Sequence, residues 1–256
     1  MILYKWLSHP KLRGLCVDDP RTTTLRREII LENSFLRQIY QDWYIRLRSA
    51  TKNKPGRLLE LGSGAGFLSD YISGLITSDV IYLPFVDLIL KGQILPFATG
   101  SLSGILMTNV LHHIPCPKEF FLEAARCIYP GGMLGMIEPW VSRWSEFIYT
   151  HFHQEPFQPH ATQWEFPSEG PLSCANGALP WIIFKRDQEL FLKELPDWKI
   201  DKIVPFMPLR YLVSGGVSLR PLMPGWSHNI WMWLESCLSP WMDSWAMFAE
   251  ITLTRR

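Results

Sequence analysis

The feature of this sequence that most restricts its fold is a glycine-rich turn that joins a short apolar run to an amphipathic pattern. The run covers residues 57–61, and the turn that follows it contains Gly62, Gly64 and Gly66. Over residues 67–72, apolar side chains recur at helical spacing. Glycine lets a backbone turn sharply and approach a ligand closely, and a helix that follows offers unpaired N–H groups. The order predicts a strand, a turn and a helix, although a tight turn without a ligand would have the same pattern.

Further apolar runs continue the alternation of strands and helices. We expect strands at 75–80, 86–90, 104–110, 133–137, 198–205 and 248–254, and helices at 118–129 and 186–195. Such alternation predicts the α/β class, with a Rossmann-like, mostly parallel seven-stranded sheet and helices on both faces.

A polar segment, residues 51–56, reads as a linker between two parts of the chain. Before it, residues 24–49 have the apolar spacing of one long helix, so we expect residues 1–55 to form an N-terminal helical cap. Residues 56–256 then form the α/β domain. The periodicity fades between 139 and about 180, which predicts a long insertion after the fifth strand, about 140–247, that covers a substrate.

The overall composition indicates a globular protein without a strongly charged partner. Hydrophobic residues make up 47% of the 256 residues, and the formal net charge is +1, so no nucleic acid is expected as a partner. The five cysteines are scattered, which argues against a disulfide framework and a structural zinc site. With no apparent signal peptide and no apolar run long enough to cross a bilayer, we expect a cytoplasmic protein; nothing in the sequence specifies its oligomeric state.

Two acidic residues flank the glycine turn. Glu60 precedes the first glycine by two positions, inside an apolar run, and therefore needs a cationic or N–H partner. Asp79 ends the second expected strand, where it can accept hydrogen bonds from a ribose diol. The glycine spacing differs from the G-x-G-x-x-G typical of pyrophosphate binding. A sulfonium ligand that carries an amino group would satisfy Glu60.

Four segments resemble motifs of the class I (Rossmann-like) S-adenosylmethionine-dependent methyltransferases, of the methyltransferase type 11-like kind. Residues 58–66 resemble the first motif, and residues 93–97 resemble the segment that passes the adenine. Residues 110–114 resemble the end of the fourth strand. Residues 121–126, followed by the Pro-Gly-Gly at 130–132, resemble the next helix and turn. The resemblance extends over residues 56–140, roughly a third of the chain.

The resemblance implies S-adenosyl-L-methionine as the cofactor and gives roles to its binding residues. The amino-acid end of the cofactor would be held by the acid and the turn, namely Glu60, Gly62, Ser63, Gly64 and Gly66. The remaining contacts would be Asp79 to the ribose, Lys91 and Gly92 beside the adenine, and Asn109 on the floor near the methionine.

Three departures from the family pattern keep a second interpretation open. Lys91 stands where many relatives have an aspartate that accepts a bond from the adenine, and a lysine cannot accept it. Ser103 replaces a common aspartate, and the segment between Asp79 and Val86 contains Pro84 and is too short for the usual helix. The alternative is therefore a non-catalytic binding or scaffold protein with the methyltransferase fold. A nucleotide-sugar or nicotinamide enzyme fits the glycine spacing poorly.

Methyl transfer requires alignment of donor and acceptor and often the removal of one proton. His112 and His113, at the end of the fourth strand, and Glu138, after the fifth, are the candidate catalytic residues. A packed histidine or a rim ion pair would explain the same residues. We expect a small-molecule acceptor that is methylated at oxygen.

The segment after the fifth strand contains a run of histidines. On an extended segment, His151, His153 and Glu155 would share one face, as metal ligands do, with His160 beyond them. Their spacing matches no known metal motif, so we expect no metal site. A share in the acceptor pocket and a solvated loop are the alternatives.

Tryptophans gather near the C-terminus, in residues 226–247. Ile230, Trp233, Leu234 and Cys237 have the spacing of one helical stripe, which favours an ordinary core helix. Apolar side chains also stand on the other sides of that helix, which favours a buried site, a partner or a peripheral membrane contact. The second interpretation suggests a hydrophobic or lipid-linked acceptor.

Overall fold

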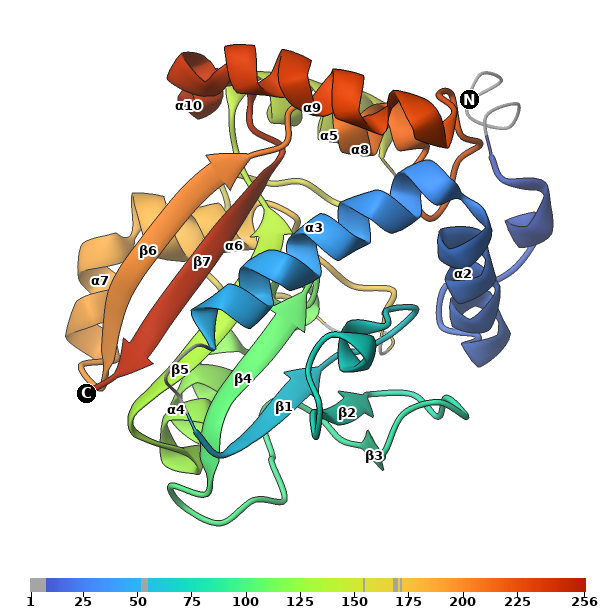
Figure 1. Ribbon diagram of the computed structural model, residues 1–256. Coiled ribbons are helices and arrows are strands. Elements are labelled where there is room, and N and C mark those ends of the chain that lie inside the picture. The colour runs from blue at the N-terminus through green and yellow to red at the C-terminus, as the bar shows by residue number, and fades with distance from the viewer. Residues whose placement is uncertain (1–7, 52–54, 154, 168–169, 171) are drawn as a thin grey trace.

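A computed structural model describes residues 8–51, 55–153, 155–167, 170 and 172–256, so part of the expected linker lies outside the described residues. Seven strands form one sheet in the order β3-β2-β1-β4-β5-β7-β6 (Figure 1). The strands are β1 (Arg57–Leu61), β2 (Ile76–Asp79), β3 (Leu88–Ile89), β4 (Leu102–Thr108), β5 (Ile128–Pro139), β6 (Trp198–Phe206) and β7 (Phe248–Arg255). Only β7 runs antiparallel to its neighbours, β5 and β6. The mostly parallel seven-stranded sheet is confirmed.

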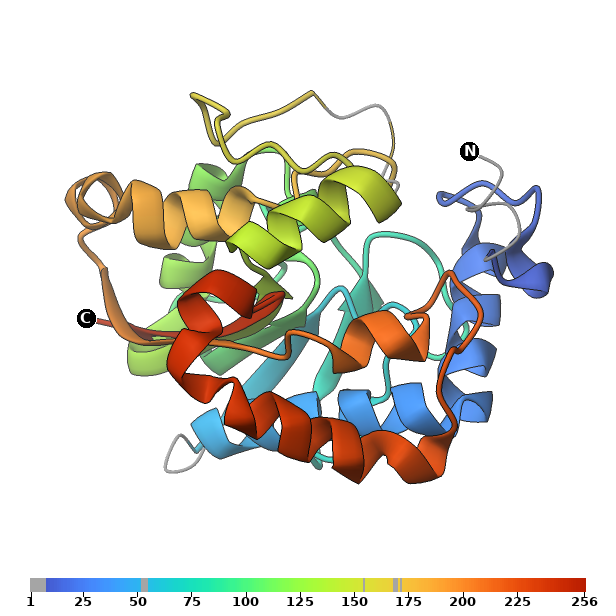
Figure 2. The same ribbon diagram turned by 90° about the horizontal axis from the view of Figure 1, so that it is seen from above.

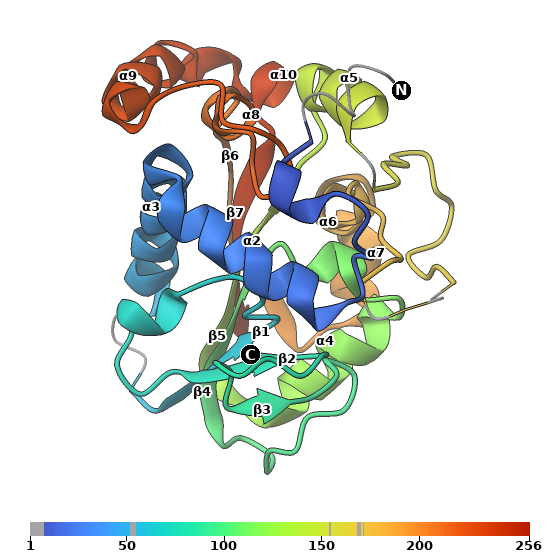
Figure 3. The same ribbon diagram turned by 90° about the vertical axis from the view of Figure 1, so that its right-hand side faces the viewer.

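Helices cover both faces of the sheet, as Figure 3 shows with the sheet seen edge-on. One core lies between the sheet and α3, and the other between the sheet and α4, α6 and α7. Along β4, Ile105 and Met107 enter one core and Leu106 enters the other, because successive side chains of a strand point to opposite faces. This explains why the central strands read as continuous apolar runs.

The helices of four or more residues are α2 (Pro20–Glu32), α3 (Ser34–Ala50), α4 (Pro117–Cys127), α5 (Arg143–Phe152), α7 (Gln188–Glu194), α8 (Arg210–Ser214), α9 (His228–Cys237), α10 (Met242–Trp245) and the π-helix η4 (Ile182–Arg186). Shorter helices are η1 (Pro10–Leu12), η2 (Leu68–Asp70), η3 (Leu111–His113), α6 (Leu179–Trp181), η5 (Gly225–Ser227) and η6 (Ser239–Trp241).

The single helix expected over residues 24–49 is wrong, because Asn33 divides it into α2 and α3. The Asn33 side-chain oxygen accepts hydrogen bonds from the backbone N–H groups of Phe35 and Leu36, each at 3.1 Å. Asparagine is a strong helix N-cap because its short side chain satisfies these exposed donors. The two helices therefore meet at an angle (Figure 3).

The helix expected after the glycine turn is also wrong, because only the single turn η2 forms there. Gly74 adopts a left-handed backbone with φ of 74° and ends the segment just before β2 begins at Ile76. Residues 80–87, all described, contain no helix either, which confirms the short connection expected there.

Two further boundaries differ from the sequence predictions. The helix expected at 118–129 ends at Cys127, and β5 begins at Ile128, before the glycine pair rather than after it. The segment expected to be irregular contains α5, whose first turn is closed by a reciprocal pair of hydrogen bonds between Ser142 and Ser145. The expected insertion is not continuous, because β6 returns to the sheet between its two parts.

The core stripe expected in the tryptophan-rich segment is wrong. Ile230, Trp233 and Leu234 of α9 are exposed, whereas His228 and Glu235 face inward. Figures 1 and 2 show α9 lying across α3, at the end of the molecule toward which β4 and β5 point. Among the described residues, no helix combines the length and the apolar character needed to cross a bilayer.

Candidate functional site

A cavity of about 810 Å³ opens at the carboxyl ends of β1, β2 and β4. This is where open α/β sheets bind ligands, and the volume suits a nucleoside together with a second small molecule. The glycine turn and the segment after β4 form its floor, and α2 and α3 contribute Arg26, Tyr40 and Tyr44. The two parts of the expected insertion cover the other side, among them Tyr149, Phe152, Phe157, Tyr211 and Leu219.

The glycine turn accepts only glycine at its ends. Gly62 has φ of 66°, and a Cβ added there would lie 2.5 Å from Cγ2 of Val110. A Cβ at Gly66 would lie 2.6 Å from the Tyr44 hydroxyl oxygen, which itself accepts a hydrogen bond from the Phe67 N–H. The turn is therefore packed against α3 and the end of β4, and its backbone borders the cavity.

Glu60 is only 2% exposed and lines the cavity without a cation at hydrogen-bond distance among the described residues. Its Oε2 accepts a hydrogen bond of 2.8 Å from the Ser63 hydroxyl. Burial raises the pKa of Glu60 to about 7, and the Ser63 hydrogen bond offsets only part of this effect. The site therefore favours a ligand that brings a positive charge.

Asp79 lies on the same cavity, on the other side of the turn. Its Oδ2 accepts the Gly64 N–H at 2.8 Å, and its Oδ1 accepts the Ile81 N–H at 3.1 Å. Burial raises the pKa of Asp79, and these backbone hydrogen bonds act against that shift. Each carboxylate oxygen can accept more than one donor, so capacity for a ligand diol remains.

The remaining cofactor-site candidates also border the cavity. Gly92 is buried, and a Cβ there would lie 3.0 Å from Cδ2 of Leu61, while Lys91 is exposed. Asn109 has a left-handed backbone with φ of 58°. Within the described residues, neither its buried Oδ1 nor the buried Oγ1 of Thr108 has a hydrogen-bond partner. Orphaned buried polar atoms are costly, so these two mark a place for ligand donors.

His112 and Glu138 form a buried pair at the end of β4. Nδ1 of His112 lies 2.7 Å from Oε2 of Glu138, whose Oε1 accepts the N–H groups of Val110 and Leu111 at 2.8 Å each. Burial opposes a charge on His112, but Glu138 and Glu155 outweigh it and raise the His112 pKa to about 9. Glu138 itself is fully buried and lies behind the histidine, away from the cavity.

His113 lies beside His112, with ring centroids 4.2 Å apart. Its Nδ1 lies 3.2 Å from the Cys174 carbonyl oxygen. Burial and the neighbouring His112 lower the pKa of His113 to about 4. Both rings line the cavity.

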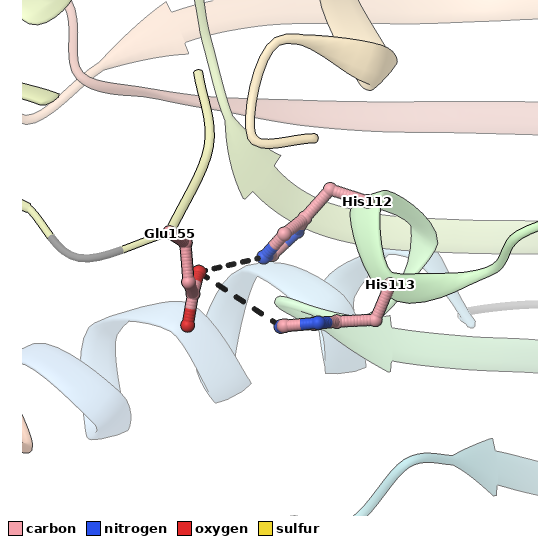
Figure 4. Close-up of side chains that lie close together, drawn as sticks. All are labelled: His112, His113 and Glu155. Atoms are coloured by element: carbon pink, nitrogen blue, oxygen red, sulfur yellow. Dashed lines mark ion pairs between the residues drawn. The ribbon is translucent and has the colours of Figure 1, made fainter. Parts of the chain in front are cut away.

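The structure also brings Glu155 to the two histidines, which the sequence did not indicate (Figure 4). Its Oε2 lies 3.6 Å from Nε2 of His112 and 4.0 Å from Nε2 of His113. By contrast, His151 lies in α5 with its Nδ1 2.8 Å from the Phe147 carbonyl, so it does not share a face with Glu155 as it would on an extended segment. A helix, rather than an extended segment, carries His151 away from that face.

The N-terminal helices supply groups that sequence reasoning missed. Arg27 donates a hydrogen bond to the Gly66 carbonyl, and its guanidinium stacks over Phe85 at 4.7 Å. Arg26 lines the cavity, and its buried Nε has no partner among the described residues. The helical pattern showed arginines on α2, but only the fold shows that this helix lies against the glycine turn.

Part of the chain is similar to a known methyltransferase domain. A family model described as a methyltransferase domain matches residues 84–136, while no curated protein matches the chain. Among solved structures, a geranyl diphosphate C-methyltransferase from Streptomyces coelicolor A3(2) is 13% identical, with 90% of this chain and 84% of that chain covered and a TM-score of 0.49. An S-adenosylmethionine-dependent methyltransferase from Mesorhizobium loti is 14% identical, with 82% and 95% covered and a TM-score of 0.47. These likenesses are too remote to indicate what this chain binds.

The matched residues include three of the four segments that carry the sequence resemblance; the glycine turn lies before them. The resemblance is confirmed over those residues, and the seven-stranded sheet has the expected class. Residues 84–136 therefore match a methyltransferase domain, and the chain has the expected Rossmann-like α/β fold.

Proposed function

We propose that this chain is an enzyme that uses S-adenosyl-L-methionine to methylate a small acceptor. The observation that supports this most directly is the pair of buried carboxylates, Glu60 and Asp79, on either side of one glycine turn and facing one cavity. A methionine-containing nucleoside carries an ammonium group at one end and a ribose diol near the other. The two carboxylates match both ends.

The cofactor would lie across the turn. Glu60 would accept the ammonium group, the backbone of Gly62, Ser63, Gly64 and Gly66 would pass beside the methionine, and Asp79 would accept the ribose hydroxyls. Lys91 and Gly92 would border the adenine, and Asn109 would use its unpaired oxygen near the methionine. When bound, the cofactor supplies a methyl group on a positively charged sulfur, which the acceptor displaces.

The acceptor would occupy the half of the cavity that His112 and His113 border. Around them, the walls are mostly apolar and include Tyr149, Phe157 and Phe248. A mostly apolar wall that contains the neutral imidazole of His113 suits a small hydrophobic molecule whose hydroxyl group must lose a proton, so we propose oxygen as the methylated atom. Glu138 touches no cavity wall and would act as a positioning residue that fixes His112.

The surface next to the cavity supports a hydrophobic or lipid-linked acceptor. Phe152 of α5 lines the cavity and is also 40% exposed. Phe147 connects it to Trp144, with ring centroids 6.1 Å from Phe152 and 6.3 Å from Trp144, and Trp144 in turn lies 5.3 Å from Trp245 of α10. Aromatic side chains thus continue from the cavity along α5 to α10, where a peripheral membrane contact would present the acceptor.

Calorimetric titration of the full chain with S-adenosyl-L-methionine tests the proposed function. We expect one site in the wild type and an affinity about 10–100-fold weaker in Asp79→Asn, since hydrogen bonds to a charged group contribute about 1.5–3 kcal/mol. Asp87→Asn is a matched control, because Asp87 accepts the Thr77 N–H on β2 but does not line the cavity. Absence of binding to the wild type would favour the binding or scaffold protein instead.

A further inference from the structure

Three side chains from two separate segments meet at one point of the cavity wall (Figure 4). His112 and His113 come from η3, directly after β4, and Glu155 comes from the segment after α5. Their nearest ligand atoms, two imidazole nitrogens and a carboxylate oxygen, all lie within 4.8 Å of one another. None of the three is fully exposed, and His112 is buried.

The spacing is too wide for direct hydrogen bonds and suitable for a shared cation. The distances from Oε2 of Glu155 to the two Nε2 atoms are 3.6 and 4.0 Å. Hydrogen bonds between such groups are shorter, at about 2.7–3.2 Å. Two atoms that bind the same transition-metal ion at about 2.0–2.2 Å lie roughly 3–4 Å apart. The distances from Glu155 to both histidines therefore fit a shared ion.

The far sides of both histidines are already held in the manner of metal ligands. Nδ1 of His112 bonds to Glu138 at 2.7 Å, and Nδ1 of His113 bonds to the Cys174 carbonyl at 3.2 Å. A carbonyl or carboxylate that receives Nδ1–H leaves the Nε2 lone pair free to coordinate, and histidine ligands in metalloproteins almost always have such a partner. Here both Nε2 atoms face Glu155. An ion pair with Glu155 would require only one of the two imidazole rings.

We propose that His112, His113 and Glu155 bind a divalent transition-metal ion. Two imidazoles and one carboxylate suit Zn²⁺, Fe²⁺ or Mn²⁺ rather than Ca²⁺ or Mg²⁺, which prefer oxygen ligands. Three protein ligands leave at least one coordination position toward the cavity. This departs from the sequence expectation of no metal site, because only the fold brings the two segments together.

The role of the ion rests on the proposed function and names its acceptor class more closely: a molecule with a hydroxyl group that coordinates the open position. Coordination lowers the pKa of the hydroxyl, which releases its proton to solvent. The oxygen then forms a bond to the methyl carbon while the carbon–sulfur bond breaks, and its electron pair stays on the sulfur.

Metal titration of the chelator-treated full chain tests the site. Co²⁺ is followed by its visible absorption and Zn²⁺ by calorimetry, with no S-adenosyl-L-methionine present. We expect one equivalent to bind the wild type and at least roughly ten-fold weaker binding in Glu155→Gln and in His113→Gln; Glu138→Gln should weaken it about 10–100-fold through the orientation of His112. His151→Gln is the matched control and should bind as the wild type does, because His151 is an exposed histidine outside the group.

Two results would overturn the site: no binding of either metal by the wild type, or equal affinity in Glu155→Gln, His113→Gln and the wild type. Thermal unfolding of each variant identifies one that fails to fold, and the other then decides. Cofactor binding separates this proposal from the proposed function. Glu155→Gln should keep the wild-type affinity for S-adenosyl-L-methionine. If the wild type binds S-adenosyl-L-methionine but no metal, that result refutes the metal site alone.

Discussion

Glu60 is a carboxyl group that the fold buries before any ligand binds. A raised pKa of about 7 means that the free protein favours the protonated form below that pH. The ammonium group of the cofactor needs the carboxylate, so binding must release a proton near neutral pH. The free-energy cost of this deprotonation comes from Glu60, and it can be measured.

The affinity for S-adenosyl-L-methionine should therefore be greater at about pH 8 than at about pH 6, where Glu60 must first lose its proton. Calorimetry in buffers of different ionisation enthalpy would detect the released proton. Glu60→Gln should bind about 10–100-fold more weakly at the higher pH. A Glu60→Gln variant with the wild-type affinity and pH dependence would show that Glu60 does not contact the cofactor.

The same residue should reduce the stability of the unliganded protein. A carboxyl group whose pKa is raised on folding stabilises the folded state at low pH relative to high pH, and this contribution is lost as the pH rises through about 7. Above that pH, Glu60→Gln should therefore increase the free energy of unfolding, by about 1–3 kcal/mol in urea titrations. A decrease there would contradict the burial argument.

Gly62 is restricted both by its positive φ and by its contact with Val110, and two substitutions can separate these effects. Gly62→Ala introduces both a strained φ and a Cβ at 2.5 Å from Val110, and it should destabilise the protein by about 2–4 kcal/mol. Gly14→Ala is the matched control, because Gly14 has a similar φ of 77° and no atom within 4 Å of the added Cβ. Urea unfolding should show the larger loss in Gly62→Ala, and equal losses would mean that the contact with Val110 costs nothing.

At the scale of elements, the sequence predicted the strands better than the helices. The central strands are buried on both faces, so their apolar runs are unmistakable, and their order along the chain gives the α/β class. Helix ends were harder, because Asn33 interrupts an apolar pattern that continues without a change of spacing from α2 to α3. Side-chain capping, which decides that boundary, depends on one residue rather than on periodicity.

The helix α9 shows why tertiary contacts can reverse a sequence pattern. Its inward face is polar: Glu235 is 4% exposed, and Oε2 accepts Nε–H of Arg210 at 2.6 Å. Arg210 also reaches Asp42 of α3 at 2.6 Å, so ionic groups attach α9 to the rest of the molecule. Apolar spacing alone cannot predict the orientation of α9, because the residues that bury its inner face are themselves charged.

Removal of one partner from this network should destabilise the protein strongly. Glu235→Ala leaves the buried Arg210 without its main partner and should lower the free energy of unfolding by about 3–5 kcal/mol, measured by urea unfolding. The double variant Arg210→Met/Glu235→Leu should recover much of that loss, since it removes both charges. Glu28→Gln, on an exposed ion pair with Lys11, should leave the free energy of unfolding nearly unchanged, because solvent screens exposed pairs. A small effect of Glu235→Ala would show that α9 is held by other contacts.

Across the whole molecule, the sequence located one half of the site and not the other. Local order along the chain joins Glu60, the glycine turn and Asp79. Glu60 and Asp79 lie at the carboxyl ends of β1 and β2, and the turn follows β1 directly. Arg26 and Glu155 come from the N-terminal helices and from the segment after α5. Their approach to the turn depends on how distant segments pack, and no spacing in the chain encodes it.

The stretch from η5 through α9 to η6 presents large apolar side chains to solvent. Trp226, Trp233 and Trp241 are 78%, 64% and 58% exposed, and Phe147 of α5 is 50% exposed nearby. Figure 2 shows α9 and α10 joined in one stretch at this end of the molecule, and α10 packs against α5. Tryptophan suits a boundary between apolar and wet surroundings, which is consistent with the proposed membrane contact.

Flotation with neutral phosphatidylcholine vesicles measures that contact. The wild type should float with the vesicles, and the triple variant Trp226→Ser/Trp233→Ser/Trp241→Ser should associate roughly ten-fold less, because its loss of apolar area weakens insertion. Thermal unfolding of the variant should change little, since these side chains are exposed. If the wild type stays with the unbound fraction, the membrane contact and the lipid-linked acceptor lose their support.

A crystal structure of the full chain grown with S-adenosylhomocysteine tests the central claim most directly, because it shows where a methionine-containing nucleoside lies. The account predicts density across the glycine turn, with the amino group within hydrogen-bond distance of Glu60 and the ribose hydroxyls on Asp79. Density elsewhere, or a cavity closed by side chains while both carboxylates face away from the ligand, would contradict it.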